Sequence, residues 1–164
     1  MHYRLYTSGD FPQLYAIEEA SFPRPDRFGR GYMRSLIAHP PSATWIAEDA
    51  DAMAGFAIVH WSGDPPRRSA YIQTIEVADA FRRQGIARKL LQLVEQSALD
   101  AGASLIWLHV DAANAPAISL YSAAGYVQQG SAEDYYGPGR PAGIYARPLP
   151  PEQPGSHPPQ SGAC

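Results

Sequence analysis

Hydrophobic and polar positions along residues 1–149 follow two different periods, and together these periods predict a mixed α/β order. In the segment 86–95, apolar residues recur at helical spacing, at positions 86, 87, 90, 91, 93 and 94. Stretches rich in β-branched and aromatic residues, such as 71–77, have strand character instead. The predicted helices are Phe11–Glu18, Tyr32–Ala38, Ile86–Glu95 and Pro116–Ala124, and the predicted strands are His2–Tyr6, Thr44–Glu48, Gly55–Trp61, Tyr71–Val77, Ser104–Val110, Tyr126–Gly130 and Ala142–Pro148.

Proline, glycine and capping residues mark where these elements end. Asp10 is placed to cap the first helix, which ends before Phe22-Pro23. Gly102 follows the long helix, where a left-handed residue commonly closes a helix. From Pro150 to Cys164, prolines alternate with glycine and polar residues, and such a segment cannot bury enough apolar surface to offset its ordering. We therefore expect one folded domain over residues 1–149 and a flexible tail over residues 150–164.

The composition narrows the class of protein. A chain of 164 residues with 45% hydrophobic content is long enough for one core and too short for two ordinary domains. No apolar run reaches membrane-spanning length and no N-terminal segment indicates export, so we expect no membrane partner. The net charge of −3 argues against nucleic-acid binding. The histidines lack metal-ligand spacing, and the single cysteine, Cys164, leaves no disulfide, so we expect a cytoplasmic protein without a metal centre.

The run from Phe81 to Ala87 is the most informative motif, because a strand precedes it and a helix follows it. Free backbone N–H groups point out of a helix N-terminus, and the helix dipole favours an anion there. Gly85 lets the backbone approach a phosphate closely, and Arg82 and Arg83 add charged donors. The P-loop and Rossmann glycine patterns are both missing from the sequence. The motif therefore predicts a pyrophosphate-binding loop of a different kind.

Two motifs in this order resemble the GNAT superfamily of N-acetyltransferases. Arg82, Gly85 and Ala87 occupy the fixed positions of its acetyl-CoA motif, Q/R-x-x-G-x-G/A. The segment from Asn114 to Tyr126 has the form N-x-x-A-I/V-x-L/F-Y-x-x-x-G-F/Y, a second element of the superfamily. The resemblance covers residues 1–149. It implies the α/β (α+β) class and the GNAT fold, a mixed, largely antiparallel sheet that is splayed at two central parallel strands and flanked by helices.

The resemblance also implies the chemistry. GNAT proteins transfer acetyl from acetyl-CoA directly to a primary amine in a ternary complex, need no metal, and commonly form homodimers. A non-catalytic acyl-CoA-binding module would keep the same cradle, and it stays open as an alternative. By resemblance, the residues expected to bind acetyl-CoA are Val77, Arg82, Arg83, Gln84, Gly85, Ile86, Ala87, Asn114 and Tyr121.

Proton transfer gives a second set of candidate residues, because an amine must be neutral to attack a thioester and the leaving thiolate needs a proton. His109 ends an apolar strand, and a histidine with a reference pKa of about 6.5 is a suitable base. Tyr71 and His109 resemble the tyrosine and histidine that relay the amine proton through water in NatE-type protein N-terminal acetyltransferases. RimI-like enzymes of the same group carry a glutamate in place of His109, and Glu76 is the rival base here. By resemblance, Tyr121 is aimed at the thioester sulfur as the general acid.

The acceptor side is indicated by two aromatic segments. Phe22-Pro23 resembles the peptide-binding loop of protein N-terminal acetyltransferases, and Tyr135-Tyr136 resembles the tyrosine pair on their hairpin loop. These segments imply a protein or peptide N-terminal α-amine as the acceptor. The segment Gly137–Gly143 is richer in glycine and proline than the loop of those enzymes. A small amine, such as a polyamine, an amino acid or an antibiotic, therefore stays open as an alternative acceptor.

Overall fold

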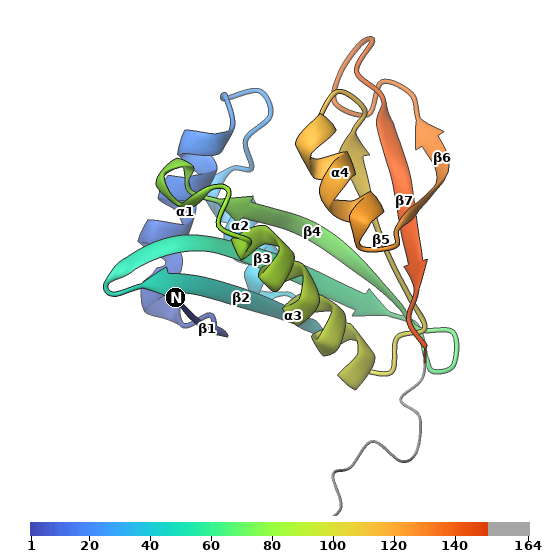
Figure 1. Ribbon diagram of the computed structural model, residues 1–164, viewed down its shortest axis with the longest axis horizontal. Coiled ribbons are helices and arrows are strands. Elements are labelled where there is room, and N and C mark those ends of the chain that lie inside the picture. The colour runs from blue at the N-terminus through green and yellow to red at the C-terminus, as the bar shows by residue number, and fades with distance from the viewer. Residues whose placement is uncertain (151–164) are drawn as a thin grey trace, which may run out of the picture.

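The computed structural model describes residues 1–150 (Figure 1). The tail expected over residues 150–164 lies outside this range apart from Pro150. Each predicted helix and strand is present within the range, and two short 3-10 turns, η1 (Ser8–Asp10) and η2 (Asp79–Phe81), were not predicted. The helices are α1 (Phe11–Ser21), α2 (Arg30–Ala38), α3 (Ile86–Asp100) and α4 (Ala115–Ala123), and the strands are β1 (His2–Leu5), β2 (Ser42–Asp49), β3 (Ala52–Ser62), β4 (Ser69–Val77), β5 (Leu105–Asp111), β6 (Val127–Ala132) and β7 (Ala142–Pro148).

The strands form one seven-stranded sheet in the order β1-β2-β3-β4-β5-β7-β6. Neighbours are antiparallel except β4 and β5, which run parallel. This is the mixed, largely antiparallel sheet with two central parallel strands that the sequence predicts, so the expected fold class is confirmed.

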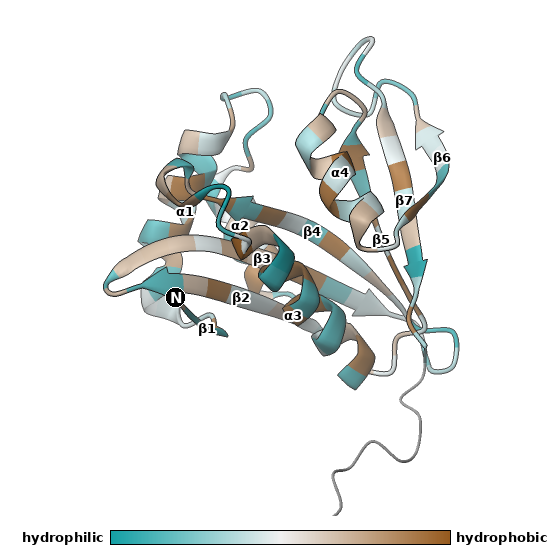
Figure 2. Cartoon of the chain, viewed as in Figure 1, coloured by the Kyte–Doolittle hydropathy of each residue, from teal (hydrophilic) through white to brown (hydrophobic). Residues whose placement is uncertain are grey.

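Helices cover both faces of the sheet: α3 and α4 lie on one face, and α1 and α2 lie on the other (Figure 1). Each face has its own hydrophobic core. Figure 2 shows hydrophobic and hydrophilic residues alternating along α3, and the apolar stripe Leu90, Leu91 and Val94 is buried against the sheet. The Trp45 indole N–H on β2 donates to Ser97 Oγ at 2.9 Å, which fixes the far end of α3. The helix is therefore held rigidly, and its N-terminus has a defined position beside β4.

The two central strands pair only briefly before they part. The parallel ladder between β4 and β5 joins three pairs of residues, of which Tyr71↔Trp107 is the last. On its other side, β4 pairs with β3 through a register shift: Ile58 faces Thr74 and Val59 faces Ile72, so Gln73 is an extra, bulged residue. A bulge of one residue resets the alternation of a strand. As a result, Thr74 and Glu76 face the same side of the sheet as Tyr71.

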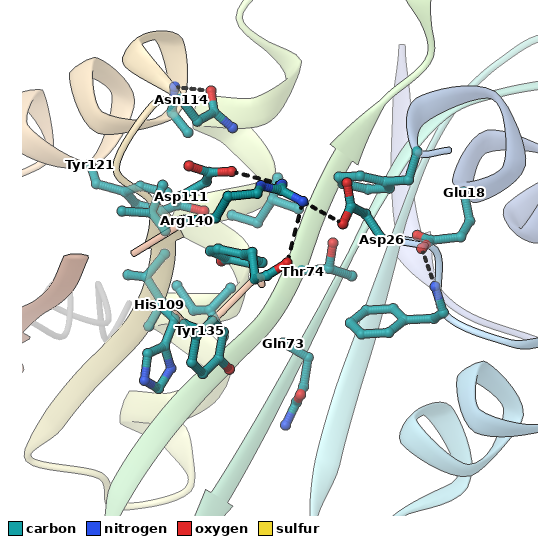
Figure 3. A pocket seen from close by; sticks show the side chains of 18 of the residues that line it. Glu18, Asp26, Gln73, Thr74, His109, Asp111, Asn114, Tyr121, Tyr135 and Arg140 are labelled. Carbon is teal, nitrogen blue, oxygen red and sulfur yellow. Dashed lines mark hydrogen bonds and ion pairs between the residues drawn. The ribbon is translucent and has the colours of Figure 1, made fainter. Parts of the chain in front are cut away.

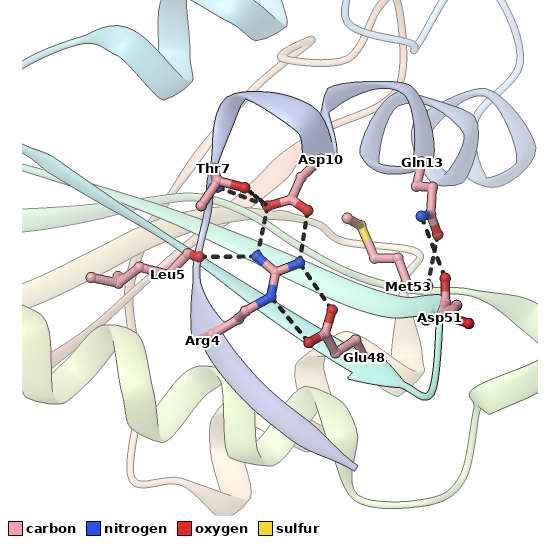
Figure 4. A network of polar contacts seen from close by, with 8 residues as sticks. All are labelled: Arg4, Leu5, Thr7, Asp10, Gln13, Glu48, Asp51 and Met53. Carbon is pink, nitrogen blue, oxygen red and sulfur yellow. Dashed lines mark hydrogen bonds and ion pairs between the residues drawn. The ribbon is translucent and has the colours of Figure 1, made fainter.

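A polar network secures the N-terminal edge, and it corrects the expected role of Asp10 (Figure 4). Asp10 is the residue before α1, but its side chain makes no cap hydrogen bond to that helix. Its carboxylate instead accepts two hydrogen bonds from Arg4, each 2.8 Å long, and one from the Thr7 N–H at 2.7 Å. The same guanidinium donates to Glu48 on β2. Two charged hydrogen bonds from Arg4 stabilise a buried carboxylate more than one cap hydrogen bond would. Asp10 therefore joins β1 to the turn before α1. The expected left-handed closure at Gly102 is confirmed, with a φ of +83°.

Candidate active site

A cavity of about 500 Å³ opens where β4 and β5 part, and side chains from both faces of the sheet line it (Figure 3). On the α1 side, the lining comes from helix α1, the α1–α2 loop and the polar faces of both strands. On the α4 side, it comes from apolar strand residues and from α4. The lining residues on the α1 side include Glu18, Phe22, Phe28, Thr74 and His109, and those on the α4 side include Ile72, Leu108, Asn114, Ala117 and Tyr121. The cavity therefore passes through the sheet, so two ligands can enter from opposite faces.

His109 lines this cavity, and Tyr71, which is not among the lining residues, contacts it. The Tyr71 hydroxyl and His109 Nδ1 are 2.8 Å apart, a hydrogen bond between the last paired part of β4 and the free part of β5. Tyr135 stacks on the His109 ring, with 4.2 Å between ring centroids and 8° between planes. Burial lowers the pKa of His109, and burial also raises the pKa of Tyr71. At neutral pH the imidazole is therefore uncharged and able to accept a proton, while the phenol keeps its own.

Tyr121 reaches the same cavity from the opposite face. It is 6% exposed and packs edge-on against Tyr126. Burial raises the pKa of its phenol, so Tyr121 keeps its proton at neutral pH. No hydrogen bond from the Tyr121 hydroxyl to another residue occurs within residues 1–150, and Tyr121 lines the cavity.

The loop before α3, expected from the sequence to hold an anion, has an unusual backbone and free N–H groups. Arg83 and Gly85 have left-handed backbones, with φ of +62° and +77°. Within the described part of the chain, the backbone N–H groups of residues 83–88 donate no hydrogen bond to the protein. A Cβ on Gly85 would meet no heavy atom within 4 Å, so the space above it is open. A pyrophosphate fits this set of free donors because nothing in the fold competes for them.

The remaining cradle residues flank this space. The Arg82 guanidinium is held by Asp79 at 2.8 Å and by the Val77 carbonyl at 3.3 Å, and it remains largely exposed. Ile86 is buried under the first turn of α3, and Gln84 is exposed beside Arg83. Asn114 caps α4, since its Oδ1 accepts from the Ala117 N–H at 3.2 Å, and it also lines the cavity.

Glu76 lies outside the lining of the cavity. It is 5% exposed and accepts a hydrogen bond from Thr74 Oγ1 at 2.9 Å. Burial, and next the adjoining Glu18 carboxyl, raise the pKa of Glu76 well above its usual range. The structure therefore does not bring Glu76 together with His109 and Tyr121, and it pairs Glu76 with a second buried acid instead.

The acceptor residues expected from the sequence are mostly, but not all, at the cavity. Phe22, Tyr135 and Tyr136 line it, whereas Pro23 forms the turn behind Phe22 and does not. Burial raises the pKa of Tyr136 to about 12, so this phenol is also protonated at neutral pH.

Sequence analysis missed four charged residues that line the cavity: Glu18, Asp26, Asp111 and Arg140. Arg140, before β7, bonds to Asp26 in the α1–α2 loop at 2.8 Å and to Asp111 at the end of β5 at 3.2 Å (Figure 3). Glu18 carried a usable signal, because a carboxylate next to Leu14 and Ile17 stands on the apolar stripe of α1. Asp26, Asp111 and Arg140 gave no such signal, because charged residues are common in loops and at the ends of strands.

Within residues 1–150, no helix is long and apolar enough to cross a bilayer. No three His, Cys, Asp or Glu side chains of this range gather as metal ligands would.

A sheet that parts at two central parallel strands, free N–H groups at the start of the adjoining helix and titratable side chains in the opening together are typical of the acyltransferase class of protein. Residues 11–126 match the family described as the acetyltransferase (GNAT) family. The chain belongs to that family.

Individual relatives agree on the family and differ in acceptor. The chain is 35% identical over 136 residues to the ribosomal protein bS18-alanine N-acetyltransferase of Salmonella typhimurium, covering 80% of this chain and 84% of the relative. It is 41% identical over 86 residues to the streptothricin acetyltransferase of Streptomyces lavendulae, covering 52% of this chain and 44% of the relative. Several of the curated relatives are matched over only about half of their length or less. The crystal structure of the ribosomal-protein-S18-alanine N-acetyltransferase from Escherichia coli superimposes with a TM-score of 0.80 at 25% identity, over 95% of this chain and 98% of that one.

Proposed function

We propose that this protein transfers acetyl from acetyl-CoA to a primary amine, and that the acceptor is the N-terminal α-amine of a protein or peptide. One observation carries the proposal: a single cavity crosses the sheet, with Tyr121 on one face and His109, which is hydrogen-bonded to Tyr71, on the other. A thioester entering from the α4 face and an amine entering from the α1 face meet between these groups. The likeness to a ribosomal protein bS18-alanine N-acetyltransferase, matched over most of both chains, supports a protein acceptor.

In this proposal, the α4 face holds acetyl-CoA. The free N–H groups of residues 83–88, with Arg82 and Arg83 beside them, bind the pyrophosphate, and Val77 and Ile86 position that loop. Asn114 contacts the pantetheine arm at the cavity wall. The bound cosubstrate supplies the activated acetyl group. Tyr121 then donates a proton to the leaving sulfur, because its phenol is protonated and has no partner in the described protein.

The α1 face holds the amine and removes its proton. His109 is uncharged at neutral pH and serves as the base, and its hydrogen bond with the Tyr71 hydroxyl orients the ring. Phe22, Tyr135 and Tyr136 enclose the acceptor, with Pro23 shaping the turn behind Phe22. We assign the base to His109 rather than Glu76, because Glu76 is buried against Glu18 and does not reach the cavity.

Release of free thiol from acetyl-CoA, measured with a matched panel of acceptors, tests this proposal. The panel contains a peptide with a free N-terminus and an internal lysine, the same peptide with its N-terminus blocked, and free small amines. We expect turnover with the first peptide and none with the blocked one.

A small-amine acetyltransferase is the second candidate, favoured by the likeness to a streptothricin acetyltransferase. It predicts turnover of the small amines and of neither peptide. A non-catalytic module predicts acetyl-CoA binding with no turnover of any acceptor.

A further inference from the structure

Two buried glutamates beside the cavity are not used by the proposed chemistry. Glu18, in the middle of α1, is 1% exposed, and Glu76, near the end of β4, is 5% exposed. No ion pair to either carboxyl occurs within residues 1–150. A buried carboxylate without a cation is costly, so two adjacent ones require a particular arrangement.

The hydrogen bonds define that arrangement, because each carboxyl has one satisfied and one unsatisfied oxygen. Glu18 Oε1 accepts from the Phe28 N–H at 2.8 Å (Figure 3), and Glu76 Oε2 accepts from Thr74 Oγ1 at 2.9 Å. Glu18 Oε2 and Glu76 Oε1 are buried without a hydrogen-bond donor among the described residues. The Glu18 carboxyl adjoins that of Glu76 and helps to raise its pKa. Two carboxylates in such a position repel each other, whereas a carboxylic acid can donate a hydrogen bond to a carboxylate, which would give each free oxygen a partner.

We propose that Glu18 and Glu76 share a single proton, and that this proton clamps the α1–α2 loop, and with it the acceptor side of the cavity, onto β4. The chain of contacts runs from Thr74 on the cavity wall through Glu76 and Glu18 to Phe28, which also lines the cavity. Tyr15 adds a second anchor, since its hydroxyl donates to the Phe28 carbonyl at 2.9 Å. Glu18 and Glu76 are thus positioning residues. The inference rests on the proposed function only where it calls this side the acceptor side.

No cation near Glu18 and Glu76 within residues 1–150 neutralises their charge, so a shared proton is the way to reduce it. The raised pKa of Glu76, caused by burial and by Glu18, agrees with a proton retained at neutral pH. From β3, the facing side chains Phe56 and Ile58 are apolar and fully buried. The other charged and titratable groups of the packed elements have partners elsewhere or are exposed. Glu19 pairs with Arg27 and Arg30, Asp26 pairs with Arg140, Arg34 lies over the Phe11 ring, His60 contacts Leu36 and Gln73, and Arg24 and Tyr32 are exposed.

Infrared spectroscopy of the whole protein tests the proton directly. At pH 7 we expect the carbonyl band of one protonated carboxyl in the wild type and in Glu19→Gln, a matched change of an exposed acid on the same helix. We expect the band to be lost in Glu18→Gln and in Glu76→Gln. A wild-type spectrum without the band, or a band that survives both buried substitutions, would overturn the proposal.

The pH dependence of unfolding gives an independent test. Folding retains a proton that an unfolded glutamate has lost above its pKa of about 4.3. Stability from the pair is therefore complete below that pH and falls as the pH rises toward the raised pKa of Glu76, by up to about tenfold in the folded-to-unfolded ratio per pH unit. In Glu76→Gln the amide can donate to Glu18 and accept from Thr74 at any pH, so this loss should be absent. Parallel curves for the wild type and Glu76→Gln would contradict a shared proton.

The acceptor KM links the clamp to the cavity. At pH values above the raised pKa, the wild type should show a rising acceptor KM with an unchanged acetyl-CoA Kd, and Glu76→Gln should not. Glu76→Leu removes both hydrogen bonds and should raise the KM at every pH. A KM that is the same in the wild type, Glu76→Gln and Glu76→Leu would refute the clamp. If no amine is acetylated at all, the proposed function fails, and the infrared and unfolding measurements still decide the shared proton.

Discussion

Removing the imidazole of His109 is the sharpest test of the proposed proton path. General-base catalysis contributes about 10²–10⁴ in rate, so His109→Ala should lower kcat/KM by that factor, which is about 2.7–5.4 kcal/mol of transition-state stabilisation. The acetyl-CoA Kd should not change, because the cradle lies on the other face of the sheet from His109. His2→Ala, which removes an exposed imidazole from β1, is the matched control and should behave as the wild type.

The structure sets a smaller effect for Tyr71. Tyr71→Phe deletes one hydrogen bond to Nδ1, and the net value of such a bond, about 0.5–1.5 kcal/mol, corresponds to about a 2- to 13-fold loss. The double variant should be no slower than His109→Ala, because Tyr71 acts through the same ring. Tyr32→Phe, which changes an exposed phenol on α2, is the matched control. A hundredfold loss in Tyr71→Phe would show that orientation of the ring is the wrong description of this residue.

The assay is the initial rate of thiol release as a function of pH. Burial lowers the pKa of His109, and only the neutral ring accepts a proton. The rate should therefore rise with pH through a value below 6.5 and be level at neutrality. The reasoning is refuted if His109→Ala keeps both the rate and the pH profile. If Glu76→Gln loses both in the same experiment, the base is the carboxylate.

Three further changes probe the parts around the catalytic groups. Gly85→Val should abolish acetyl-CoA binding in a calorimetric titration and cost about 1–2 kcal/mol of stability, because its φ is +77°, whereas Gly130→Val, in open space on the exposed strand β6, should do neither. Arg140→Gln should raise the acceptor KM at low salt with little effect on the melting temperature, and a salt-independent KM would contradict its ion pairs. Arg4→Met should cost about 1.5–3 kcal/mol in chemical denaturation at neutral pH. Since Arg4 lowers the pKa of Asp10, that difference should shrink as the pH falls through it, and a constant difference would count against the pairing.

The sequence predicted the elements well where the apolar period is strong. Residues 86–95 show the period clearly, and α3 begins at Ile86 as expected. Gly102 closes the helix as predicted because the left-handed conformation there is a local requirement. Asp10 shows the limit of predictions from local sequence. Its carboxylate binds Arg4 on β1 instead of capping α1, and the local sequence does not record that partner.

The site was predictable only in part, for a related reason. Tyr121 and His109 sit on regular elements, so their positions follow from the element order. The bulge at Gln73 has no signature in the alternation of β4, yet it decides that Glu76 faces Glu18. The ion pairs of Arg140 depend on how segments far apart in the sequence approach each other, and the pattern of apolar and polar residues does not predict that approach.

The brief pairing of β4 and β5 gives the sheet an internal edge. Edges with unpaired backbone groups recruit other strands, and proteins normally cover them. Beyond Tyr71, the edge of β4 borders the cavity instead. An extended chain with amide groups can bond to such an edge through its backbone, whatever its side chains are. Under the proposed function, we therefore expect tolerance toward different acceptor sequences to come from the sheet, and discrimination between acceptors to come from charged groups that line the cavity, such as Asp26, Asp111 and Arg140.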